Sequence, residues 1–212
     1  MNVSLSQTSK MPSKSIGLSA WLCITGSKLA QIPSTVCHKC YARRGFFNMP
    51  SVKTAMESRL EFMLSEQFVP RMIAVLGMED LFRWFDSGDI QSEKMGHDIL
   101  DIIEATPWCK HWLPSKGYTM WRNILKERKL PPNVALRFST PKDDTRPIKV
   151  PEGVGTSTTY THEDSAANVV YGCIAHKVKE ETGSYNCGSC RACWDTSVSN
   201  IAYPKRYESK RK

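Results

Sequence analysis

Apolar and β-branched residues recur along residues 16–160 in two patterns, short continuous runs and helical spacing. The short runs predict strands, because Val, Ile and aromatic side chains suit a pleated, half-buried surface. Apolar residues three and four positions apart predict helices. The predicted strands cover residues 16–22, 81–85, 110–113, 134–138 and 155–160. The predicted helices begin after Pro50, break near Pro70, and then cover residues 92–105 and 118–129.

The spacing of the last four strands matches a repeated strand-and-helix unit, which favours parallel pairing. We therefore expect an α/β fold, an incomplete (β/α) barrel of about five parallel strands. The last crossover, residues 140–154, contains three prolines and is too short for a regular helix. The barrel should therefore stay incomplete.

This pattern divides the chain into four segments. Residues 1–15 should form a flexible lead, and residues 16–165 the partial barrel with the first cysteine group. Residues 166–200 should form a C-terminal cysteine-rich segment that binds metal. Residues 201–212 should form a basic tail.

Composition indicates a globular protein and limits the cellular locations in which it is expected. Of the 212 residues, 41% are hydrophobic, which is enough for a core. No run of eighteen apolar residues occurs, and the first residues are mostly polar. The sequence therefore predicts no membrane span, no secretory signal and a cytoplasmic location.

Basic residues exceed acidic ones by 29 to 21, which gives a formal net charge of +8. Arg43, Arg44, Lys53 and Arg59 follow the first cysteine group closely. A phosphate-bearing partner is a common reason for such a bias, so nucleic acid or a nucleotide is the expected partner. A host protein is a second candidate partner, and a solvated basic face is the alternative to both.

Four cysteines in one short segment, Cys173, Cys187, Cys190 and Cys193, indicate a metal site. Three of them stand three residues apart, a spacing that suits the corners of an iron–sulfur cube better than the tetrahedron around one zinc ion. Zinc remains the alternative metal. Two disulfides are a third interpretation, which the absence of a secretory signal disfavours.

A second group, Cys23, Cys37 and Cys40, offers three thiolates without a fourth cysteine nearby. Three ligands on a 4Fe-4S cluster would leave one iron open to a small molecule or substrate. Alternatively, His38, Cys109 or a C-terminal cysteine supplies the fourth ligand, and the site is structural.

Small or polar residues follow each predicted strand, and sites in parallel α/β folds lie at those carboxyl ends. We therefore expect seven residues to converge on one rim there, namely Cys23, Asp86, Asp89, Ser115, Lys116, Ser139 and Thr161. The turn from Asp86 to Asp89 suits a polar ligand, because Gly88 allows close approach and the two carboxylates are candidate catalytic groups. An ordinary helix-capping turn is the alternative. Lys116 and Arg137 could pair with these acids or hold an anionic substrate. The candidate cofactor-binding residues are Ser87, Gly88, Asp89, Ser115 and Ser139.

With these residues in view, the chain resembles the bacteriophage family called gene product 88, and more remotely radical S-adenosylmethionine enzymes. The resemblance covers most of residues 16–200. The motifs that carry it are Cys23 with residues 37–42 (CHKCYA), residues 83–89 (RWFDSGD), residues 111–115 (HWLPS) and residues 187–194 (CGSCRACW).

The family resemblance implies a phage origin, hence host cytoplasm, together with an iron–sulfur protein and a small βα barrel. The more remote resemblance implies a radical-SAM-like fold with an open cluster at Cys23, Cys37 and Cys40. It also implies S-adenosylmethionine near residues 87–89 and an auxiliary cluster at the C-terminal cysteines. The first cysteine gap here holds thirteen residues, whereas those enzymes have three.

Two functions emerge as hypotheses. The first is an iron–sulfur enzyme of radical type that acts on a nucleotide or nucleic acid. The second is a non-catalytic module in which iron–sulfur or zinc sites staple the fold and a basic surface binds nucleic acid or a host protein.

Overall fold

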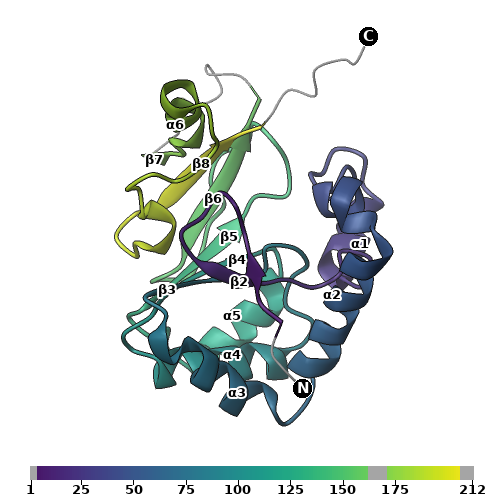
Figure 1. Ribbon diagram of the computed structural model, residues 1–212, viewed down its shortest axis with the longest axis vertical. Helices are drawn as coiled ribbons and strands as arrows, with labels where there is room; N and C mark the ends of the chain where they lie inside the picture. Colours follow the sequence, from purple (N-terminus) through teal and green to yellow (C-terminus); the bar gives the residue numbers. More distant parts are fainter. Residues whose placement is uncertain (1–3, 162–170, 206–212) are drawn as a thin grey trace.

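The computed structural model describes residues 4–161 and 171–205 and confirms an α/β fold with a mostly parallel sheet (Figure 1). The eight strands lie in the order β1-β2-β3-β4-β5-β6-β8-β7, and only the β1–β2 pair is antiparallel. The strands are β1 (Ser6–Gln7), β2 (Lys14–Ile16), β3 (Leu81–Trp84), β4 (Lys110–Ser115), β5 (Val134–Ser139), β6 (Gly155–Tyr160), β7 (Tyr171–Gly172) and β8 (Asn200–Pro204).

Helices connect the strands and gather mainly on one side of the sheet, where Figure 1 shows α3, α4 and α5 together below β3, β4 and β5. The α-helices are α1 (Ile24–Ala30), α2 (Pro50–Met63), α3 (Phe68–Val75), α4 (Glu93–Ala105), α5 (Tyr118–Glu127) and α6 (Ala175–Thr182). Short 3-10 helices are η1 (Tyr41–Arg43), η2 (Gly45–Asn48), η3 (Leu76–Met78) and η5 (Ala192–Trp194). Within the described ranges, no helix has the length and apolar character needed to cross a bilayer.

Alternation along the strands sends one set of side chains toward the helices. On β5, Leu136 and Phe138 join the main hydrophobic core, together with Trp84 of β3 and Trp121 of α5. Helix α4 is capped by Ser92, whose hydroxyl accepts a hydrogen bond from the Met95 amide at 3.1 Å. This cap satisfies an N-terminal amide that the helix itself leaves unpaired.

The other set of strand side chains faces the C-terminal cysteine segment instead of a helix. Trp112 of β4 packs edge-to-face against Trp194 of η5, with ring centroids 5.4 Å apart. The Trp194 indole donates to the Phe82 carbonyl of β3 at 2.8 Å. The cysteine segment therefore covers part of the face that the helices leave open.

Several sequence predictions need correction. The strand predicted over residues 16–22 ends at Ile16, and residues 24–30 form α1, a helix that the apolar pattern did not predict. The predicted basic tail is wrong at its start, because residues 200–204 form β8 and pair with β6. Five parallel strands is too few. Among the described strands, β1 and β7 form the two edges, so the sheet is open.

The remaining predicted elements agree well with the structure. The strands near 84, 112, 136 and 158 become β3, β4, β5 and β6, and the helices after them become α4 and α5. Residues 140–154 contain no helix, as their prolines predict. Pro70 lies in the first turn of α3, where a missing amide hydrogen costs nothing.

A buried imidazole links β3, β4 and the end of α4. The Trp84 indole can only donate, so its bond of 3.2 Å places the acceptor lone pair on His111 Nδ1. The proton of the neutral ring then lies on Nε2, which contacts Thr106 Oγ1 at 3.0 Å. Burial lowers the pKa of His111 to about 4. Protonation would place two N–H donors against each other in the core.

We predict that His111 makes the protein less stable in acid. In the unfolded chain this imidazole has its ordinary pKa of 6.5, whereas in the folded chain it stays neutral down to about 4, so stability is full above 6.5 and falls as the pH drops toward 4. Between pH 7 and pH 4, the free energy of unfolding should fall by about 3 kcal/mol less in the neutral variant His111→Gln than in the wild type, as measured by urea unfolding at both pH values. Equal slopes for both proteins would contradict the assignment.

Candidate metal centre

The four C-terminal cysteines, which the sequence groups as a candidate metal site, line one small cavity. Cys173, Cys187, Cys190 and Cys193 all border it, and its other lining residues include Tyr171, Ile174 and Trp194. All eight cysteines of the chain are free thiols. The disulfide interpretation therefore has no support, and the four sulfurs are available as ligands.

Backbone hydrogen bonds with distant parts of the chain place these thiols. The Cys173 amide donates to the Ala202 carbonyl of β8 at 2.8 Å, and the Cys187 amide donates to the Lys10 carbonyl at 2.9 Å. Gly188 takes a left-handed conformation with φ of +49°, which lets the chain turn between Cys187 and Cys190. The cavity thus depends on both ends of the described sequence.

The guanidinium of Arg137 holds the cysteine segment against β5. Its three nitrogens donate to four backbone carbonyls, those of Ala192, Cys193, Asp195 and Val198, at 2.7 to 3.2 Å. The side chain is 1% exposed. The prediction that Arg137 pairs with Asp86 or Asp89 is wrong, because its donors are occupied by this segment.

The surroundings of the four thiols combine burial with positive charge. Burial raises the pKa of Cys193 to about 12 and raises the pKa values of Cys173 and Cys187. Lys10 acts against this rise at Cys173, and Arg83 and Arg191 act against it at Cys187. These thiols should therefore ionise only when a bound cation compensates the cost.

Two tyrosines and one arginine complete the cavity's polar surroundings. The Tyr171 hydroxyl lies 3.3 Å from Cys190 Sγ, and the Tyr203 hydroxyl lies 3.2 Å from Cys193 Sγ. Arg83 Nε is buried without a hydrogen-bond partner. These donors fit a group that carries negative charge on sulfur.

The four thiols do not form a ready-made site for a single metal ion. Among the described residues, no three His, Cys, Asp or Glu side chains lie close enough together to hold one ion. A tetrahedral zinc site needs sulfurs only about 3.8 Å apart, whereas a four-iron cube binds each sulfur at a different corner. Zinc and an iron–sulfur cluster therefore both stay predictions for this cavity.

The first cysteine group lies near the carboxyl ends of β3 and β4. Cys23 is the N-cap of α1, and its sulfur accepts from the Gly26 amide at 3.2 Å. Burial raises the pKa of Cys23 to about 12, and the negative charges of Asp89, Cys37 and Cys40 add to the rise. The three thiols are therefore electrostatic neighbours, although they do not form a close three-sulfur group.

The two nearby candidates for a fourth ligand to the first cysteine group differ in their surroundings. Cys109 is 0% exposed and lies in the main hydrophobic core, which excludes it. His38 Nδ1 contacts the Ala30 carbonyl at 2.9 Å, a contact that metal-binding histidines commonly make with one ring nitrogen. His38 therefore stays a candidate ligand beside Cys23, Cys37 and Cys40.

Asp89 joins the ends of two neighbouring strands. Its carboxylate accepts from the Ser115 hydroxyl and the Lys116 amide, both at 2.6 Å, and from the Ile90 amide at 2.8 Å. Burial raises its pKa, and these three hydrogen bonds oppose the rise. Cys37 experiences the charges of both Asp89 and Lys116. Of the seven residues expected on one rim, four therefore lie near one another, namely Cys23, Asp89, Ser115 and Lys116.

The other predicted rim residues make internal contacts. Ser87 donates to the Leu18 carbonyl at 2.7 Å, and Gly88 adopts φ of +76°, with a Cβ there falling 2.7 Å from the Leu18 side chain. Asp86 Oδ2 accepts from Ser15 at 2.9 Å, but buried Oδ1 has no hydrogen-bond partner. Ser139 pairs with Ser157 at 2.8 Å. The absence of a side chain at Gly88 therefore makes room for Leu18, whereas the sequence predicts room for a ligand there.

Sequence reasoning missed the tyrosines and cations around the C-terminal cavity. Tyr203 lies ten positions after Cys193 and reaches it only because β8 enters the sheet. Arg137 binds backbone carbonyls, and every residue type has such a carbonyl, so no sequence pattern could indicate these partners. Thr161, expected at the rim, instead binds the Asp144 carboxylate through its amide and hydroxyl, both at 2.7 Å.

We predict that Arg137→Met loosens the cysteine segment and destabilises the fold by about 3 kcal/mol or more, because four buried carbonyls lose their donor. Chemical denaturation and alkylation of Cys193 would measure the two effects. The control is Arg122→Met, which removes an exposed arginine that donates to one carbonyl. Equal stability of the two variants would rule out the anchoring role.

No curated protein and no solved structure matches this chain. The family model described as gene product 88 matches residues 3–196. This match spans most of the 212 residues. The chain therefore belongs to the gene product 88 family.

Proposed function

We propose that this protein is an iron–sulfur protein whose C-terminal cysteines bind a 4Fe-4S cluster. The observation that carries the proposal is that four free thiols, Cys173, Cys187, Cys190 and Cys193, border one cavity. Free thiols gathered in this way are typical of metal sites.

Charge balance supports a cluster at this position. A 4Fe-4S core with four thiolates carries about two negative charges in its common oxidised state. Arg83, Arg137 and Lys10 lie close enough to act on the cysteine thiols. The Tyr171 and Tyr203 hydroxyls can donate to sulfur, which tunes a cluster's reduction potential.

The first cysteine group supports a further proposal, an enzyme of radical-SAM-like type. Cys23, Cys37 and Cys40 would hold a second cluster and leave one iron open for S-adenosylmethionine, whose reductive cleavage is the chemistry such a cluster supplies. The sequential order of the parallel strands from β2 to β6 supports a partial (β/α) barrel. Asp89 and Lys116 would orient a nucleotide or nucleic-acid substrate at the same edge.

Anaerobic reconstitution followed by iron, sulfide and zinc analysis tests the metal proposal. We expect about seven to eight irons per chain with both clusters, and about four with the C-terminal cluster alone. The double variant Cys187→Ser/Cys190→Ser should lose about four irons. The control Cys109→Ala alters a core cysteine outside both groups and should keep its iron. Zinc without iron would reject the proposal.

The radical proposal predicts 5'-deoxyadenosine when the reconstituted protein is incubated with S-adenosylmethionine and dithionite. Replacing Cys37 by Ser should abolish the product. The double variant Cys187→Ser/Cys190→Ser should still form it, because these residues belong to the other cysteine group. Absence of 5'-deoxyadenosine, together with an unchanged cluster spectrum on adding the cofactor, would count against radical chemistry while leaving the iron–sulfur proposal intact.

A second candidate function is a non-catalytic, metal-stapled module that binds nucleic acid or a host protein. The observation that favours it is that Ser87, Ser115 and Asp89, which were expected to bind a ligand, form hydrogen bonds within the protein. In this case the clusters would stabilise the fold and the basic surface would make the contact. Nucleic-acid binding without any 5'-deoxyadenosine would favour this function.

A further inference from the structure

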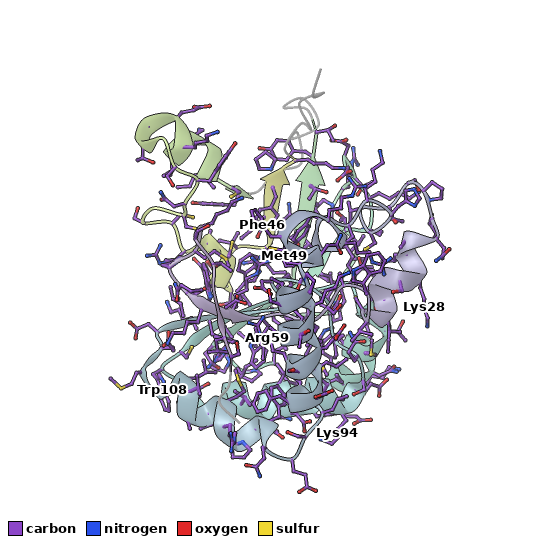
Figure 2. All side chains as sticks on the ribbon, turned by 45° about the vertical axis from the view of Figure 1, so that its right-hand side comes forward. Lys28, Phe46, Met49, Arg59, Lys94 and Trp108 are labelled. Atoms are coloured by element: carbon purple, nitrogen blue, oxygen red, sulfur yellow. The ribbon has the colours of Figure 1, made fainter. Side chains whose placement is uncertain are left out.

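Exposed apolar side chains gather in one part of the described chain. Among the rings, Phe46 is 83% exposed, Tyr41 62% and Trp21 51%. Figure 2 shows Phe46 and Met49 close together where η2 leads into α2. Exposed apolar surface of this kind marks a contact site. Seven of the ten exposed large hydrophobic residues lie within residues 21–49, namely Trp21, Leu22, Ile24, Ile32, Tyr41, Phe46 and Met49.

Hydrogen bonds and cation–π contacts join the segments that carry these rings into one surface. The Trp21 indole donates to Asn48 of η2 at 3.3 Å, and the Asn48 amide donates to the Arg43 carbonyl of η1 at 2.8 Å. The Arg43 guanidinium and the Lys53 ammonium lie 5.0 and 5.5 Å from the centre of the Trp21 ring. Residue 21, η1, η2 and the first turn of α2 are therefore neighbours.

The charge of this region is mostly positive, with the exposed Glu57, one helical turn after Lys53, as the first acidic residue of the chain. Residues 1–56 contain five Lys and two Arg but no Asp or Glu. Five of the seven cations fall between Lys28 and Lys53. The nearby carboxylates of Asp86 and Asp89 are buried. Cations alternating with exposed rings are the combination that proteins use to bind unpaired nucleic-acid strands.

We propose that Trp21, Tyr41 and Phe46, with Arg44 and Lys53, form a binding surface for single-stranded nucleic acid. Phosphates would lie against the cations, and unpaired bases would stack on the rings. A duplex fits less well, because its bases are already stacked and paired.

The surface also includes Leu22 and Ile24, on either side of Cys23. A bound strand would therefore pass over the first cysteine group. This placement names the substrate class for the proposed enzyme. Binding of the strand is independent of the proposed function, whereas any reaction of the bound strand rests on it.

Fluorescence anisotropy with a labelled oligothymidylate of about 20 nucleotides tests the surface on the reconstituted full chain. Phe46→Ala and Trp21→Ala should each weaken binding at least about five-fold. The matched control is Trp108→Ala, which removes an equally exposed tryptophan, also 51% exposed, far from Phe46 in Figure 2. Lys53→Gln should lower the slope of log affinity against log salt by about one.

Iron and sulfide counts on the same samples separate the binding surface from the cluster proposal. Normal cluster content without oligonucleotide binding rejects the surface alone, whereas binding that persists in iron-free protein supports it. Wild-type affinity in both Phe46→Ala and Lys53→Gln, or a duplex bound as tightly as the single strand, would overturn it. If Trp21→Ala lowers the iron count, the result for Phe46→Ala is used to judge the surface. The Phe46 ring projects into solvent, so its removal should leave the fold intact.

Discussion

The hydrogen bonds of the Arg137 guanidinium hold the cysteine segment against the sheet, and the rest of the structure depends on this contact. An arginine stays charged in a protein interior, so it needs acceptors for its donors. Residues 192–198 provide four carbonyls, and by doing so they lie flat against β5. The sheet thereby gains a partner for a buried charge, and the cysteine segment gains a fixed position. Neither would be stable in this form without the other.

The two faces of the sheet serve different purposes. On one face, Leu136 and Phe138 pack with helices and supply hydrophobic stability. On the other, Trp112 and Arg137 receive the cysteine segment. The first cysteine group lies apart from both, near the strand ends beside Asp89. The fold can therefore support two thiol groups without crowding either of them.

Sequence patterns predicted what local chemistry determines and missed what distant contacts determine. β3 to β6, α4 and α5 follow from apolar spacing and prolines, and cysteine spacing predicted which thiols share the C-terminal cavity. β8 was missed, because residues 200–204 are few and precede a basic run, and pairing with β6 makes them a strand. The contacts of Ser87 and Asp86 were also unreadable, since they depend on residues 15–18.

The position of β8 ties the two ends of the cysteine segment together. It follows β7 in sequence yet lies between β6 and β7 in the sheet, and the Cys173 amide bonds directly to it. Tyr171 of β7 pairs with Ile201 of β8, so the chain returns across thirty positions before Cys173 and Cys193 border the same cavity. A substitution that disrupts β8 would therefore open the four-thiol cavity without touching any of its cysteines.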